Sequence, residues 1–448
     1  MIGRVLLGCL ALLLARGPLA EASIESVLPR RWSGPALAPQ PEISELQQAV
    51  AAFSRGDEDG CLTYLRAARE RHPHLPPARL MLARMFLGSG QTVRGRAELE
   101  RVAATEASAP EIHLTFGELA LREGRWSDAE VHLLRAGSLT LPEVWPAAQR
   151  DHFATVRLDG LAEVAKQRGQ WERAGQILGQ ALARSSNDAL LHYRMARVHF
   201  ERQDLGACRR QLESAVAADP SLAPVETLLG QFHARAAQPE QAERLLGSAA
   251  RAHPENAQAQ LAYSSWLLNA GRSEAAWETA QAALQADPAS RDARFWCGMV
   301  QRLLGQPDEA EPFFQAVVDQ SPEDREAVLH LAIVLAEQNS PAKEQRALEL
   351  ARSVVQQDPT HREALATLGW CSFQLGRLDD AERLLRTAMW DGKGSAAAAY
   401  YLAQVFAARG AHDQARPLLE AVSQAPRNFP YRRAARDQLA DSARSEGP

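Results

Sequence analysis

The chain has 448 residues, a net charge of −5 and a pI of about 6.2. That length is too great for one ordinary hydrophobic core, so it predicts several domains or a repeat array. A nucleic-acid-binding protein usually carries a strong basic excess, and the slightly acidic balance argues against nucleic acid as a partner.

The first 22 residues have the pattern of a secretory signal peptide. One positive charge at Arg4 precedes an apolar run over 5–15, and Ala20-Glu21-Ala22 offers a small-x-small cleavage site. The apolar run is too short to cross a bilayer. We therefore expect an exported protein, periplasmic or secreted, with no transmembrane helix in the mature chain.

A lipid anchor is the alternative for the same segment. Leu6-Leu7-Gly8-Cys9 resembles a bacterial lipobox, which would make Cys9 an acylated N-terminus. A lipobox normally closes the apolar run, whereas Cys9 lies in its middle. Cleavage without an anchor at Cys9 is therefore the favoured interpretation.

Residues 23–41 contain four prolines and are expected to form a linker, and residues 42–429 then repeat with a period of 34. A small residue recurs along this stretch, and eight of the ten steps between successive positions are 34 residues. The other two steps are 45 and 37 residues, as insertions would give. The recurring residues are Cys61, Gly95, Ala129, Ala174, Cys208, Ala242, Ala276, Ala310, Ala347, Ala381 and Ala415.

Each period reads as two helices joined by a turn that often contains glycine, as at Gly124, Gly271 and Gly376. Numbered from the first helical residue of each repeat, the small residues above occupy position 20, and position 8 is small as well. Small residues at both positions allow the two helices to cross closely. Large apolar residues at position 7 and a leucine-rich position 24 are expected to fill the groove beside that crossing.

This pattern resembles the tetratricopeptide repeat (TPR) family, and the export signal suggests its secreted or periplasmic bacterial type. The resemblance implies an all-α fold, a right-handed α-solenoid of about eleven helix-turn-helix units. The expected units begin near residues 42, 76, 110, 155, 189, 223, 257, 291, 325, 362 and 396.

Two segments depart from the regular array. An insertion over 144–154, which contains Trp145, separates the third and fourth units and is expected to lengthen the helix that follows. It is either a tolerated loop or a partner contact. Residues 430–448 are expected to form a polar C-terminal capping helix and tail.

The residues offer no enzymatic chemistry. The motifs HExxH, GxSxG and GxxxxGK[ST] are absent, and the glycine-rich stretch 88–92 lacks the lysine of a phosphate-binding loop. His72 and His74 form the only tight histidine pair, without nearby cysteine or carboxylate ligands. We expect no catalytic site, no metal and no cofactor.

The resemblance implies instead that the first helices line a concave groove through positions 2, 5, 6, 9 and 12. Aromatic and arginine side chains are typical binding anchors, and an extended peptide could lie across them. Positions 5, 6 and 9 lack the lysine and asparagine with which some family members clamp chaperone C-termini. Tight packing of the superhelix, which would bury some of these side chains, is the alternative. The expected groove residues are Tyr193, Arg194, Arg197, Phe295, Met299, Arg302, Trp370, Phe373, Tyr400 and Gln404.

The sequence therefore predicts a non-enzymatic scaffold or adaptor that binds protein or peptide partners of unknown identity. A membrane-anchored accessory protein of an envelope polysaccharide or secretion machinery is the alternative.

Overall fold

The computed structural model describes residues 44–390, 392, 394–426 and 429–445. Within these ranges every regular element is a helix, 23 in all, with no strand, which confirms the all-α fold. None of the described helices is long and apolar enough to cross a membrane. The expected signal peptide (1–22) and linker (23–41) lie outside the described residues.

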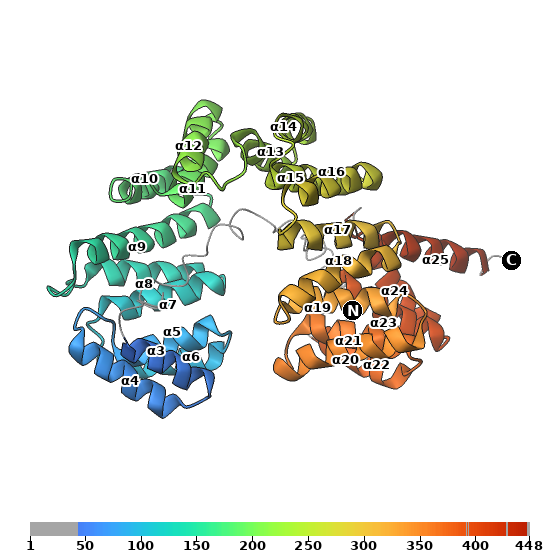
Figure 1. Cartoon of the computed structure of the whole chain (residues 1–448), viewed down its shortest axis with the longest axis horizontal. Helices are drawn as coiled ribbons and strands as arrows, with labels where there is room; N and C mark the ends of the chain where they lie inside the picture. Colours follow the sequence, from blue (N-terminus) through green and yellow to red (C-terminus); the bar gives the residue numbers. More distant parts are fainter. Residues whose placement is uncertain (1–43, 391, 393, 427–428, 446–448) are drawn as a thin grey trace. The chain divides into compact units, whose positions relative to one another are not determined.

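The described residues form two compact bodies, an N-terminal body over 44–225 and a C-terminal body over 226–445. Successive helices are joined by short turns in each body (Figure 1). The N-terminal body contains α3 (Ser44–Ser54), α4 (Glu58–Arg71), α5 (Ala78–Gly88), α6 (Thr92–Thr105), α7 (Pro110–Arg122), α8 (Trp126–Ser138), α9 (Ala147–Gln167), α10 (Trp171–Leu182), α11 (Ala189–Glu201) and α12 (Leu205–Ala218). The C-terminal body contains α13 (Val225–Arg235), α14 (Pro239–Ala252), α15 (Ala257–Asn269), α16 (Ser273–Ala286), α17 (Arg291–Leu303), α18 (Pro307–Gln320), α19 (Arg325–Ala336), α20 (Pro341–Gln357), α21 (Arg362–Gln374), α22 (Leu378–Ala388), α23 (Ala396–Ala408), α24 (His412–Ser423) and α25 (Arg432–Ser445).

The turn inside each repeat places its position 15 in the left-handed region. At Gly376, where φ is +71°, the N–H of the next residue, Arg377, donates to the carbonyl of Ser372 at 2.9 Å and closes the end of α21. The glycine turns predicted from the sequence are thereby confirmed. Positive φ occurs at Gly56, Gly90, Gly124, Gly169, Gln203, Ala237, Gly271, Gly305, Asn339, Gly376 and Gly410.

The two helices of a repeat approach each other closely at position 8. A Cβ atom added to Gly369 in α21 would lie 2.7 Å from Cγ of Leu385 in α22 and 3.4 Å from the carbonyl oxygen of Ala381. The same contact recurs at Gly298, where an added Cβ would lie 2.9 Å from the ring of Phe314. Position 8 therefore has to be small because the side chain at position 24 packs onto it. The backbone at position 20 is the next neighbour.

The insertion over 144–154 packs onto its own body. Helix α9 begins inside it, at Ala147, and is 21 residues long, so the insertion does lengthen the following helix. Trp145 is buried, and its ring centroid lies 5.5 Å from that of Phe153. The tryptophan is therefore a core residue of the N-terminal body and is not presented at the surface.

The close approach at position 8 gives a stability prediction. Gly369→Ala is expected to destabilise the chain by about 1–3 kcal/mol, because the new methyl group must displace the fully buried Leu385. The midpoint of urea unfolding, followed by circular dichroism at 222 nm, measures the change.

Gly179 in α10 provides the matched control. A Cβ atom added there meets nothing within 4 Å, so Gly179→Ala should raise stability by about 0.5–1 kcal/mol through the lost backbone freedom of glycine. If Gly369→Ala and Gly179→Ala changed the unfolding midpoint in the same direction, the role assigned to position 8 would be contradicted.

Candidate functional site

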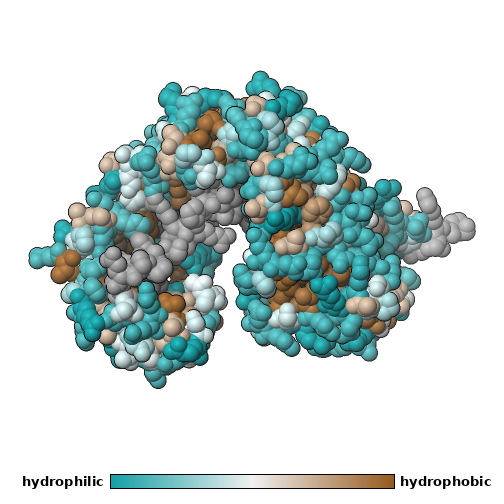
Figure 2. Space-filling view, in the orientation of Figure 1, coloured by the Kyte–Doolittle hydropathy of each residue, from teal (hydrophilic) through white to brown (hydrophobic). Residues whose placement is uncertain are grey.

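The first helices of the C-terminal body bring several of the expected groove residues together. Arg302 lies on α17, Trp370 on α21 and Tyr400 on α23, and all three contact Tyr431, which directly precedes α25. These helices follow one another through the C-terminal body, from yellow to orange in Figure 1. Figure 2 shows hydrophobic patches within the hydrophilic surface over α17 and α19.

The ring of Tyr431 lies in an aromatic environment. It stacks on Tyr400 with the ring centroids 4.4 Å apart and the planes at 6°, and it meets Tyr401 nearly edge-on at 5.4 Å. Trp370 stacks on Tyr401 at 4.4 Å and on Phe373 at 5.3 Å. Three of the aromatic residues expected to line the groove, Trp370, Phe373 and Tyr400, thus form one continuous cluster with Tyr401 around a tyrosine that comes from outside the helix pairs.

The hydroxyl of Tyr431 is held by an ion pair between the buried Arg302 and the half-buried Glu337. Arg302 Nη2 donates to it at 2.6 Å, the Tyr431 hydroxyl donates to the carboxylate of Glu337, and the Tyr401 hydroxyl lies 3.1 Å away. Arg302 Nη2 lies 3.5 Å from Glu337 Oε1, and the arginine side chain is only 6% exposed. Burial and Glu337 raise the pKa of Tyr431 well above its usual value, against the opposing Arg302, so this phenol is neutral.

Two buried donors in this cluster have no acceptor among the described residues. They are Nε1 of Trp370 and Nε of Arg302. Both residues are less than a tenth exposed, so each donor has lost its water without gaining a protein partner. We call the set formed by Arg302, Glu337, Trp370, Tyr400 and Tyr401 the tyrosine site.

The structure buries most of the expected groove residues. Gln404 is half-buried and pairs with Gln438 of α25 at 2.9 Å, while Phe295 packs against Phe314 and His330. Phe295 and Met299 belong to the hydrophobic core of the C-terminal body. The buried members of the expected set are Tyr193, Phe295, Met299, Arg302, Trp370 and Tyr400, and the half-buried ones are Arg194, Arg197, Phe373 and Gln404.

Sequence reasoning missed Tyr431 and Glu337. Glu337 occupies position 13 of its repeat, one residue beyond the last position expected to face inward. Tyr431 falls in the segment expected to be a polar cap. The one available signal was the run Phe429-Pro430-Tyr431, which is strongly aromatic for a polar terminus.

The first helices of the N-terminal body carry paired charges. Arg194 on α11 forms an ion pair with Asp159 on α9, and Arg197 Nε donates to Glu201 at 3.0 Å. Tyr193, which precedes Arg194 in the chain, is buried.

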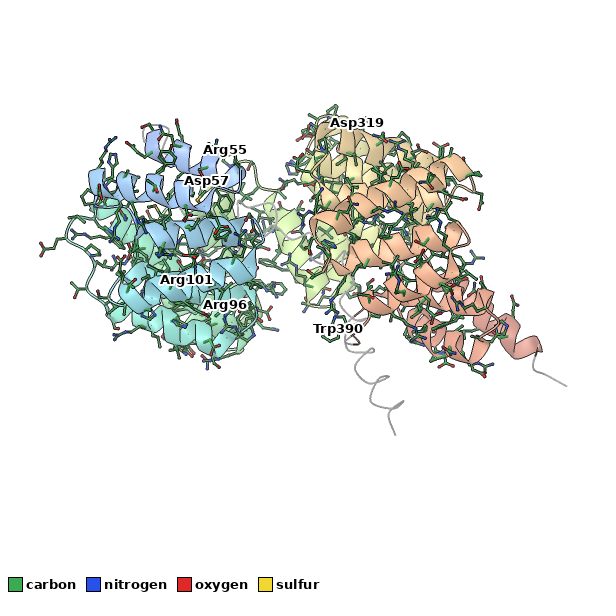
Figure 3. The ribbon with its side chains drawn as sticks, turned by 90° about the horizontal axis from the view of Figure 1, so that it is seen from below. Arg55, Asp57, Arg96, Arg101, Asp319 and Trp390 are labelled. Atoms are coloured by element: carbon green, nitrogen blue, oxygen red, sulfur yellow. The ribbon has the colours of Figure 1, made fainter. Side chains whose placement is uncertain are left out.

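The second helices of the N-terminal body are also charged. Arg96 and Arg101 project from α6 and pair with Glu123 and Glu98, respectively (Figure 3).

No group of three or more histidine, cysteine, aspartate or glutamate side chains in the described part of the chain is arranged to hold a metal ion. The four described cysteines are buried and unpaired, and burial raises the thiol pKa of Cys61 to about 11. Buried neutral thiols of this kind are inert packing groups.

Comparison with known proteins identifies the repeats. Two models of the tetratricopeptide repeat match the chain, one at residues 165–232 and 343–391 and the other at 227–291, 266–325 and 298–344. Together they span 165–391 without a gap, just over half of the chain.

One curated relative and two solved structures illustrate the similarity. A tetratricopeptide repeat and J domain-containing co-chaperone from Fusarium oxysporum is 24% identical over 191 residues, or 41% of this chain, and the chain spans only 36% of its length. A tetratricopeptide repeat protein from Parabacteroides merdae is 15% identical with a TM-score of 0.45. The match covers 56% of this chain and 97% of the Parabacteroides chain. Yeast Tom70 is 12% identical with a TM-score of 0.36, and the match covers 90% of this chain and 96% of Tom70.

The charges of the N-terminal body give a pH prediction. Burial disfavours ionisation of Glu163 in α9, but Lys166, whose Nζ donates to it at 2.7 Å, and Arg194 together lower its pKa from 4.5 to about 2. The ionised carboxylate therefore stabilises the fold above pH 4.5, and this contribution is lost as the pH falls toward 2. Glu163→Gln should reduce stability at pH 7 by up to about 3 kcal/mol and flatten its decline on acidification.

Urea unfolding at a series of pH values from 7 to 3 measures this effect. Lys166→Met, which removes the partner and keeps the carboxylate, should remove much of the same pH dependence. Curves for Glu163→Gln that run parallel to the wild type at every pH would show that the ion pair makes no contribution.

Proposed function

The chain belongs to the tetratricopeptide repeat family, and we propose on that premise that it is a non-enzymatic scaffold that binds protein or peptide partners along the first helices of its repeats. The supporting observation is the cluster around Tyr431. Side chains from α17, α21 and α23, together with the end of α19, jointly hold a segment that is not part of any helix pair.

The chemistry of this surface suits a peptide. Arginine and stacked aromatic side chains are the usual anchors of protein interfaces, and the unpartnered N–H groups of Trp370 and Arg302 could each donate a hydrogen bond to a backbone carbonyl of a ligand. The N-terminal body offers mainly charges that are already paired. We therefore assign partner binding first to the C-terminal body, and we call the tyrosine site together with Phe373 and Gln404 its inner surface.

We also propose that the chain is exported and acts in the periplasm or outside the cell. The support is the sequence of residues 1–22, with its charged start, apolar run and cleavage site. The membrane-anchored accessory protein of an envelope polysaccharide or secretion machinery is the second candidate, and it rests on the lipobox-like residues that end at Cys9.

Mass spectrometry of the protein purified from its own cells tests these two candidates. The first predicts a mature N-terminus that directly follows Ala22. An acylated Cys9 would contradict it and would establish the anchored form.

The inner-surface assignment predicts the effect of two substitutions. Phe373→Ala with Gln404→Ala should lower partner capture about tenfold, because both side chains lie on the first helices beside the tyrosine site and neither is fully buried. The measurement is quantitative mass spectrometry of the proteins that the immobilised chain retains from a cell extract.

Trp390→Ala is the matched control. Trp390 follows α22, is 77% exposed and is labelled in Figure 3, so its loss also removes an aromatic group from the C-terminal body but not from the first helices. Capture should be unchanged in this variant. If the double variant retains partners as well as the wild type does, or if Trp390→Ala loses them equally, the inner surface is not the binding surface.

A further inference from the structure

The segment that fills the tyrosine site is joined to the repeats by a short stretch of chain. Helix α24 ends at Ser423, and Tyr431 lies eight residues further on. Phe429 is also part of the seated segment, with its ring centroid 5.6 Å from that of Tyr431. Because the linking chain is short, the effective concentration of Tyr431 at the site is on the order of millimolar.

The tyrosine site matches the hydrogen-bonding capacity of a neutral phenol. A phenol both donates and accepts, and here it donates to Glu337 while it accepts from Arg302. The Tyr431 ring meets Tyr400 face to face and also lies under the Arg302 guanidinium, at 5.4 Å from ring centroid to Cζ. Hydroxyl and ring are therefore both recognised.

Other side chains fit this site poorly. Phenylalanine could stack but would leave Arg302, whose side chain is only 6% exposed, and Glu337 without their shared hydroxyl. A phosphorylated tyrosine or a carboxylate would place negative charge against Glu337 and could not donate to it. The tyrosine site thus distinguishes tyrosine from its nearest chemical relatives.

The segment of the chain itself does not satisfy the site completely. Nε1 of Trp370 and Nε of Arg302 remain buried without acceptors among the described residues while Tyr431 is in place. A buried donor without an acceptor costs free energy, so a ligand that supplied acceptors could replace the resident segment.

We propose that the tyrosine site is a docking subsite for an extended partner segment that carries an unphosphorylated tyrosine, and that Tyr431 occupies it until the partner displaces it. This inference rests on the proposed function, because it specifies what the inner surface of the C-terminal body binds. The partner tyrosine takes the hydroxyl contacts of Tyr431, and its neighbouring backbone supplies acceptors to the two donors.

The test uses the full chain and a peptide taken from it. The probe is a fluorescein-labelled synthetic peptide with the sequence of residues 425–436, and its binding is followed by fluorescence anisotropy. Tyr431→Ala empties the site, so this variant should bind the probe at least about tenfold more tightly than the wild type. Trp390→Ala, which leaves Tyr431 seated, should bind it as weakly as the wild type does.

Two altered peptides test recognition of the hydroxyl. Against the Tyr431→Ala chain, a peptide with phenylalanine in place of the tyrosine should bind about tenfold more weakly, and a phosphotyrosine peptide should not bind measurably. Equal binding of all three peptides would show that the site does not recognise a phenol, and the proposal would fail.

Other results would also overturn it. A folded Tyr431→Ala chain that binds no probe would show that the resident segment is a structural cap only. Should Tyr431→Ala lose its helical circular dichroism, the Tyr431→Phe chain decides instead, because it keeps the ring stacking. It should bind the tyrosine peptide more tightly than the wild type, and failure to do so contradicts the proposal.

These outcomes are separable from failure of the proposed function. If Phe373→Ala with Gln404→Ala weakens partner capture but no tyrosine peptide binds, the inner surface binds partners without this subsite. If capture is unaffected, the proposed function itself fails.

Discussion

The close contact between positions 8 and 24 within each repeat is the constraint on which the rest of the structure depends. At Gly369 the space for even one methyl group is taken by Leu385, and at Gly298 it is taken by Phe314. Combined with a left-handed residue at position 15, this contact fixes how the second helix returns along the first. The two helices of each repeat therefore pack in one fixed arrangement. As a result, equivalent positions of successive first helices lie on the same face of the array.

The tyrosine site follows from this regularity. Residues separated by scores of positions in the chain, such as Arg302, Trp370 and Tyr400, meet because each comes from a first helix of the C-terminal body and each occupies an inward position. The surface they create combines stacked rings with an ion pair between the buried Arg302 and the half-buried Glu337. The buried charge of Arg302 is tolerated because Glu337 pairs with it and the Tyr431 hydroxyl accepts a hydrogen bond from it.

The sequence was sufficient for the architecture and insufficient for the site. The period of 34, the glycine turns and the small residue at position 8 are local patterns, and they predicted the all-α fold, the turn at Gly376 and the close contact at Gly369. The contacts of Tyr431 are not local in the sequence, since its hydrogen-bond partners Arg302 and Glu337 lie 129 and 94 residues before it. The exposure of Trp370 also depends on which residues pack over it, and the repeat pattern does not predict those residues.

We propose that Tyr431 and α25 reversibly cover the inner surface of the C-terminal body, where a partner binds. Hydrogen–deuterium exchange of the full wild-type chain, with and without a large excess of the unlabelled peptide 425–436, measures this reversibility. Amides of α25 should exchange faster when the peptide is present, while those of α21 and α23 stay protected. Unchanged protection of α25 at saturating peptide would contradict it.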